Sequence, residues 1–163
     1  MKIKTIFISF ISGFLFWLAL NVSLEPQILI SGVLVSALLA GLFYKIAVFD
    51  DVSLTPKALT AMISWFFIFS IELVKSNIDV LLRVISPKVR INPGIVEVKT
   101  KLNSKLGRLM LANSITLTPG TLTVDILEDK LFIHWIDVTS TDINEATNAI
   151  VSKFEKPLEV IFG

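Results

Sequence analysis

The sequence predicts a membrane protein in two parts: three transmembrane helices in residues 1–85, then a small α+β domain in residues 86–163. Hydrophobic residues make up 53% of the 163 residues, above the ~45–50% of soluble domains. Charge is uneven, because residues 83–163 hold ten of the fifteen Lys and Arg and nine of the fourteen Asp and Glu. That second part also shows strand and helix periodicities.

Three apolar segments approach the ~20 residues that a ~30 Å hydrocarbon core requires: about 3–22, 27–49 and 57–82. The first resembles a signal peptide in its basic start, but no A-x-A-like site follows and a second apolar segment begins almost at once. Glu25 and Pro26 separate the first two segments, which predicts a tight helical hairpin. Asp50 and Asp51 end the second segment.

The second segment contains small residues every few positions. They either let a neighbouring helix approach closely or reflect the ordinary glycine content of a lipid-exposed helix. These residues are Gly32, Ser36, Ala37, Ala40 and Gly41.

The third segment changes character along its length. Glu72, Lys75, Asp79 and Arg83 are spaced by 3, 4 and 4 residues, so they share one helical face. Ionisable residues in a membrane helix are functional candidates. Glu72 and Lys75 therefore form either an interfacial ladder of ion pairs, which we favour, or a polar lining at a subunit contact.

The positive-inside rule leaves the orientation of three spans undecided. Four basic residues lie on one side and three on the other: Lys2, Lys4, Lys45 and Lys57 against Arg83, Lys88 and Arg90.

In the second part we expect strands at 95–99, 121–126 and 131–138, and helices at 104–115 and from Asp142 onward. Asp142 with Glu145 resembles a capping box. The order β-α-β-β-α matches most of a ferredoxin-like fold, with helices on one face of a sheet. A domain of about 75 residues has a thin core, so we expect it to lean on a partner or on the membrane surface.

Composition excludes several functions. A net charge of +1 makes nucleic acid an improbable partner. The chain has no Cys, and its single histidine is His134, so it cannot supply a thiolate or multi-histidine metal site. We predict no catalytic residue, no cofactor and no metal.

Residues 111–126, LANSITLTPGTLTVDI, are polar for a membrane protein. Pro119 and Gly120 suit the central positions of a type II turn, and the neighbouring hydroxyls can satisfy its backbone groups. The alternative is a nucleophile among Ser114, Thr116 and Thr118, which needs a base. Only His134 is available, without a nucleophile-elbow signature around it, so we do not expect an enzyme.

This stretch, followed by LFIHWIDV at 131–138, resembles the signature region of the E subunit of the multisubunit Na+/H+ antiporters, the Mrp family (also called Mnh or Pha). The resemblance extends over nearly the whole chain. The resemblance implies that its motif residues shape the turn and the contacts with neighbouring subunits. These residues are Asn113, Ser114, Thr116, Thr118, Pro119, Gly120, Thr121, Asp125, His134, Trp135 and Asp137.

The resemblance implies an accessory subunit, needed for assembly and full activity of a complex that exchanges Na+ for H+ across the cytoplasmic membrane. Its partners would be the other subunits and the lipid bilayer. The C-terminal domain is expected on the cytoplasmic side, which with three spans places the N-terminus outside. Related modules occur in redox-driven complexes such as membrane-bound hydrogenases, and the sequence does not separate these two settings.

Overall fold

The computed structural model describes residues 2–43, 51–88 and 91–163. The chain divides into two compact units, Met1–Val52 and Ser53–Gly163. The predicted fold class is confirmed: within these described residues, three helices long and apolar enough to cross a membrane precede a small antiparallel sheet with its own helices. The third of these helices belongs to the second unit. The predicted boundary between residues 85 and 86 is a different one, because it separates the membrane part from the part in water, and it stays a prediction.

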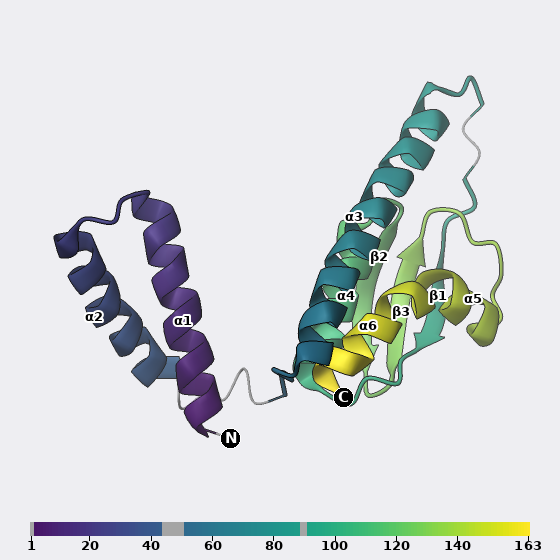
Figure 1. The fold of residues 1–163 in the computed structure, drawn as a ribbon. Helices are drawn as coiled ribbons and strands as arrows, with labels where there is room; N and C mark the ends of the chain where they lie inside the picture. Colours follow the sequence, from purple (N-terminus) through teal and green to yellow (C-terminus); the bar gives the residue numbers. More distant parts are fainter. Residues whose placement is uncertain (1, 44–50, 89–90) are drawn as a thin grey trace. The chain divides into compact units, whose positions relative to one another are not determined.

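The first unit is a helical hairpin of α1 (Lys2–Asn21) and α2 (Pro26–Phe43), as predicted (Figure 1). Gly32, Ser36 and Ala40 are buried at a spacing of four residues. A Cβ atom added at Gly32 would lie 2.6 Å from Cδ1 of Trp17, so the hairpin depends on a small residue there.

Ala37 and Gly41 are exposed and contribute nothing to this contact. The predicted end of the second helix at residues 44–49, together with Asp50, lies outside the described residues.

The second unit begins with α3 (Pro56–Ile85). Its start is capped by Thr55, whose hydroxyl accepts a hydrogen bond of 3.1 Å from the backbone N–H of Ala58. Pro56 occupies the first turn, where its missing N–H costs nothing.

A three-stranded sheet forms the centre of the second unit: β1 (Gly94–Lys99), β2 (Thr121–Leu127) and β3 (Lys130–Trp135). Its order is β1-β3-β2, and β3 is antiparallel to both neighbours. The helix α4 (Lys105–Leu117) therefore links two parallel strands with a third strand between them, the split βαβ arrangement of a ferredoxin-like fold.

The chain ends in two helices, α5 (Ile143–Ile150) and α6 (Ser152–Phe162), where the sequence predicts one. Asp142 caps α5 as predicted, accepting hydrogen bonds from the N–H groups of Asn144 and Glu145. The interruption falls at Val151. Ile150, Val151 and Phe154 are all buried, so the interruption lets apolar side chains on both sides of the junction enter the core.

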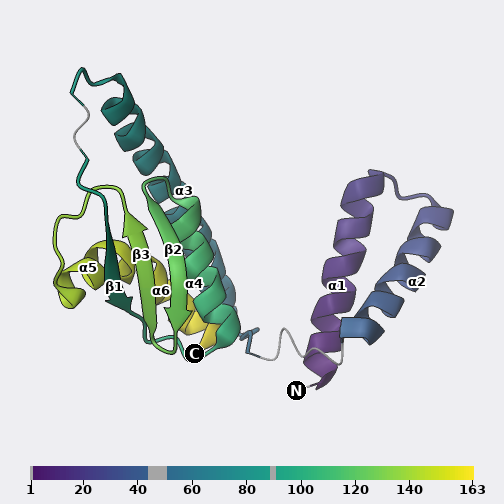
Figure 2. The ribbon, with the colours of Figure 1, turned by 180° about the vertical axis from the view of Figure 1, so that it is seen from behind.

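The helices α4, α5 and α6 cover one face of the sheet (Figure 2). Side chains from β1 and β3 pack there against helix residues. These buried residues are Val96, Val98, Leu131 and Ile133 on the strands, and Leu111, Ile115, Phe154 and Leu158 on the helices. On the opposite face Ile95, Leu122 and Val124 are at least half exposed, as expected of a sheet with helices on one side.

Candidate functional site: a polar groove beside the third helix

The helix α3 is held against the α+β elements along most of its length, and its last turns project beyond them (Figure 1). It packs on α6, and four contacts mark its course. These are Ser53 N–H to Ile161 O at 2.7 Å, Trp65 Nε1 to Ser114 Oγ at 3.2 Å, Lys153 Nζ to Glu72 Oε2 at 2.6 Å, and Arg83 Nη1 to Asp137 Oδ2 at 2.8 Å.

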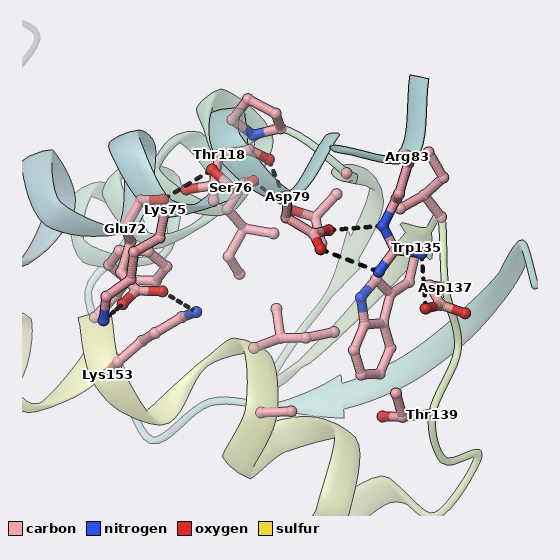
Figure 3. A pocket seen from close by; sticks show the side chains of 18 residues that line it. Glu72, Lys75, Ser76, Asp79, Arg83, Thr118, Trp135, Asp137, Thr139 and Lys153 are labelled. Carbon is pink, nitrogen blue, oxygen red and sulfur yellow. Dashed lines mark hydrogen bonds and ion pairs between the residues drawn. The ribbon is translucent and has the colours of Figure 1, made fainter. Parts of the chain in front are cut away.

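The second half of α3 borders a groove of about 300 Å³, which we call the polar groove (Figure 3). Its other walls are the turn at residues 118–121, the segment that follows β3, and the junction of α5 and α6. The groove therefore brings together segments from both ends of the second unit. Its charged residues are Glu72, Lys75, Asp79, Arg83, Asp137 and Lys153.

Glu72 lies between two lysines. Its Oε1 atom is 3.1 Å from Nζ of Lys75, one helical turn away, and its Oε2 atom is 2.6 Å from Nζ of Lys153 on α6. The Glu72 side chain is 20% exposed. The Lys75 contact follows from helical spacing, whereas Lys153 is 81 residues away in the sequence and no local pattern points to it.

Arg83 joins two carboxylates in the same way. Its Nε atom is 2.7 Å from Oδ2 of Asp79, four residues earlier, and its Nη1 atom is 2.8 Å from Oδ2 of Asp137 after β3. A planar guanidinium can serve two acceptors at once because its N–H groups point in fixed, different directions. The groove thus carries three positive and three negative side chains, each paired with an opposite charge.

The predicted ladder on α3 exists, and it extends beyond the helix. Two of its ion pairs lie within α3, and two connect α3 with the α+β elements. These connecting pairs make Glu72 and Arg83 part of the packing between α3 and the domain.

The turn at residues 118–121 has the geometry expected of type II. Gly120 has φ +96°. The third position of a type II turn requires a positive φ, which residues other than glycine and asparagine rarely adopt. Thr121 N–H donates to Thr118 O at 3.3 Å. A Cβ atom at Gly120 would lie 3.1 Å from Cγ2 of Ile136, so the chain passes close to the segment after β3.

The hydroxyl groups around this turn bond main-chain atoms. Thr118 Oγ1 donates to Ser114 O at 2.7 Å, and Thr121 Oγ1 donates to Ile115 O at 2.6 Å. Thr123 N–H donates to Thr116 Oγ1 at 3.1 Å. These bonds tie the end of α4 to the start of β2.

The residues of the predicted motif divide into three groups. Thr118, Pro119, Gly120, Thr121, Trp135 and Asp137 line the polar groove. Asn113, Thr116 and Asp125 border a shallow depression between α4 and β2. Ser114 is buried beneath Trp65, and His134 lies in β3, paired with Ile95 and Leu122.

This division leaves no nucleophile arrangement around Ser114 and Thr118. Both are buried and donate to main-chain carbonyls. Within the described residues, no group of three His, Asp or Glu side chains is placed to hold a metal ion.

Glu155 is a residue that the sequence did not single out. It is 7% exposed, and its Oε1 atom accepts hydrogen bonds from Thr100 Oγ1 at 2.6 Å and from Lys101 N–H at 2.8 Å. The sequence offers one indication that Glu155 is buried. It lies four residues after Val151 and three before Leu158, so it shares the buried side of the helix with them.

Comparison with known proteins defines the class. The family described as Na+/H+ ion antiporter subunit matches residues 10–161. The E subunit of the Na+/H+ antiporter of Bacillus subtilis (strain 168) is 41% identical over 105 residues, 63% of this chain and 65% of that protein. The E1 subunit of the Na+/H+ antiporter of Staphylococcus haemolyticus (strain JCSC1435) is 33% identical over 161 residues, 93% of this chain and 92% of that protein.

A solved structure also matches. A chain of the membrane-bound sulfane sulfur reductase, described as an archaeal respiratory membrane complex, is 45% identical with a TM-score of 0.85. The match covers 97% of this chain and 99% of that chain.

These matches, together with three apolar helices and a small α+β domain in the described residues, define the class of this chain. It is a membrane protein similar to subunits of ion-transport complexes. The chain belongs to the family of Na+/H+ antiporter E subunits.

Proposed function

We propose that this chain is a non-catalytic accessory subunit of a multisubunit membrane complex that exchanges Na+ or another monovalent cation for protons. The observation that carries the proposal is the family match over residues 10–161, together with the E1 subunit of Staphylococcus haemolyticus, which aligns over nearly its whole length. The chain's role is to support assembly and transport.

The distribution of charge supports an accessory role. The sequence of α1 carries only Lys2 and Lys4, at its start, and α2 carries no charge. Ion and proton paths across a membrane use ionisable or polar groups inside it. The ionisable groups of the polar groove lie in the second half of α3 and on the α+β elements beside it, and α1 and α2 offer none beyond the start of α1, so in this proposal the transport path belongs to other subunits.

Residues 1–85 form the membrane part in this proposal, and residues 86–163 form a domain on the cytoplasmic side. The motif residues shape two surfaces of that domain, the polar groove and the depression beside Asn113, Thr116 and Asp125. Neighbouring subunits contact the domain there. Glu72 and Lys75 act as structural ion pairs rather than as a proton relay.

A second candidate function is favoured by the archaeal match. At 45% identity over 97% of this chain, that respiratory-complex chain is more similar than the E1 subunit of Staphylococcus haemolyticus, at 33% over 93%. The parent complex would then be a redox-driven ion pump. This chain would supply no cysteine ligand to an iron–sulfur cluster, because it contains no Cys.

A pull-down in mild detergent from the native host, with mass spectrometry of the bound proteins, separates these proposals. Antiporter subunits alone support the antiporter, and the same subunits with redox proteins support the redox-driven pump. A chain that is recovered alone and transports cations in liposomes contradicts both.

A further inference from the structure

The helix α3 has two faces of opposite kind. One face packs on the domain, where Ala58 and Ala61 are buried and Glu72 and Arg83 make ion pairs. The opposite face is mainly apolar and open: its large hydrophobic side chains are more than half exposed, and Ser70 and Asn77 are polar residues among them. Along α3 this face includes Leu59, Ile63, Phe67, Val74, Ile78 and Leu81.

The open face needs an apolar environment, and exposed apolar surface of this extent marks an interaction site. A helix of 30 residues is roughly 45 Å long at ~1.5 Å per residue, well beyond the ~30 Å hydrocarbon core. Length and composition permit α3 to cross a bilayer, but packing adds a further constraint.

The domain accompanies α3 along most of its length, and the last turns of the helix project beyond the sheet (Figure 1). Contacts occur near its start at Ser53, in its most apolar part at Trp65, and near its end at Arg83. If α3 stood upright in the bilayer, the helices and the sheet beside it would enter the hydrocarbon. Edge strands with unpaired backbone groups do not occur there, and charged residues such as Lys156 on α6 are costly there.

We propose that α3 lies along the membrane surface, with its open apolar face in the lipid and the α+β domain on its aqueous side. The chain then has three membrane helices, of which α1 and α2 cross and α3 lies in the interface. Amphipathic helices take this position when one face is apolar and the other is polar. In this chain the polar face of α3 is covered by the α+β domain, which lies between the helix and the water.

The charges of the sequence agree with this arrangement. With α1 and α2 as the two crossing helices, Lys2, Lys4, Lys45 and Lys57 all lie on one side. The connection between these helices, residues 22–25, contains Glu25 and no Lys or Arg. With three crossing helices, the count of basic residues on the two sides is four against three. With two crossing helices, four basic residues lie on one side of the membrane and none on the other, which is the pattern of the positive-inside rule. The N-terminus is then cytoplasmic, together with the domain.

Exposed lysines beside the open face favour lipid as its occupant. The side chain of Lys75 is 68% exposed, and Lys57 and Lys88 are exposed near the two ends of α3. Lysines bordering an apolar helical face bind anionic headgroups while the apolar side chains enter the acyl region.

A cysteine accessibility experiment tests the orientation directly, because the chain has no Cys. Lys57→Cys and Lys88→Cys mark the two ends of α3, and Leu24→Cys marks the connection between α1 and α2. Each variant is expressed in the intact complex, treated with a membrane-impermeant maleimide in right-side-out and in inverted vesicles, and read by the mass shift of this chain alone.

We expect Lys57→Cys and Lys88→Cys to react from the same side, and Leu24→Cys from the other. If Lys88→Cys reacts from the side of Leu24→Cys, α3 crosses the membrane and the proposal is overturned. This readout does not depend on transport, so it separates failure of the proposed orientation from failure of the proposed function.

A second measurement tests lipid as the occupant. Nitroxide labels on Ile63→Cys, Val74→Cys and Leu81→Cys report collisions with oxygen, which concentrates in lipid, and with a water-soluble nickel chelate. We expect the ratio of oxygen to nickel collisions to be high and similar at all three positions. Low collision rates with both reagents would mean that a protein covers this face, and a ratio that rises and falls along α3 would mean that the helix crosses; either result contradicts the proposal.

Discussion

The backbone conformation of one glycine determines how α4 connects to β2. Gly120 combines φ +96° with a close approach to Ile136. Non-glycine residues at positive φ are strained by about 1–3 kcal/mol, but asparagine tolerates this region better than β-branched residues do. The turn in LTPGT therefore places a specific demand on its fourth residue.

We predict that Gly120→Val destabilises the chain by about 2 kcal/mol or more, and that Gly120→Asn destabilises it less. Both replacements add a Cβ atom beside Ile136, and valine differs from asparagine in tolerating positive φ less well and in carrying a second γ-carbon. The measurement is the thermal stability of the solubilised complex together with the amount of this chain retained in it. Equal losses for the two variants would assign the effect to crowding against Ile136 instead.

The buried carboxylate of Glu155 is a second single group on which the fold depends. Replacing it with alanine leaves the Thr100 hydroxyl and the Lys101 N–H without their acceptor. An unsatisfied buried polar group costs about 1–3 kcal/mol, so Glu155→Ala should lower the stability by about 2–4 kcal/mol. Lys156→Ala, at the exposed neighbouring position, is the matched control and should have an effect below ~0.5 kcal/mol.

At the scale of elements, the α1–α2 hairpin depends on one small residue. A Cβ atom at Gly32 would meet the indole of Trp17 at 2.6 Å, whereas one at Gly41 meets nothing within 4 Å. Gly32→Ala should therefore weaken the hairpin by about 1–3 kcal/mol through overpacking, and Gly41→Ala should not weaken it. Incorporation of each variant into the complex checks this, and equal incorporation of the two would contradict it.

The ion pairs between α3 and the domain lead to a prediction about transport. Glu72→Gln removes one negative charge from the groove but keeps its shape, and partly exposed ion pairs contribute only ~0.2–1 kcal/mol. We expect cation/proton exchange by the intact complex to remain near the wild-type rate. If exchange is abolished while subunit stoichiometry is unchanged, Glu72 takes part in proton movement and the structural role is wrong.

At the scale of the molecule, α6 is the layer that joins α3 to the domain. It contacts α3, α4 and α5, and Leu158 is fully buried within it. Truncation of a buried leucine costs about 2–5 kcal/mol, so Leu158→Ala should destabilise the second unit by about 3 kcal/mol. Val160→Ala, on an exposed side of the same helix, should cost less than about 1 kcal/mol. Proteolysis in detergent measures both, and similar protection of both variants would show that α6 is not the joining layer.

The sequence alone determined much of this protein's local structure. Hydrophobic length predicted the three membrane helices, and alternation with turn chemistry predicted the three strands and the Pro119–Gly120 turn. Spacing predicted the pairs Glu72–Lys75 and Asp79–Arg83. These features depend on residues a few positions apart, for which periodicity is a sufficient guide.

Tertiary structure alone decided which distant segments meet. It joined Lys153 to Glu72 and Asp137 to Arg83, and it divided the motif residues between the polar groove and other positions. It also placed α3 in one compact unit with the α+β domain, although its composition is that of a membrane span. Hydropathy measures how much apolar surface a helix has, but only packing determines which face remains for the lipid.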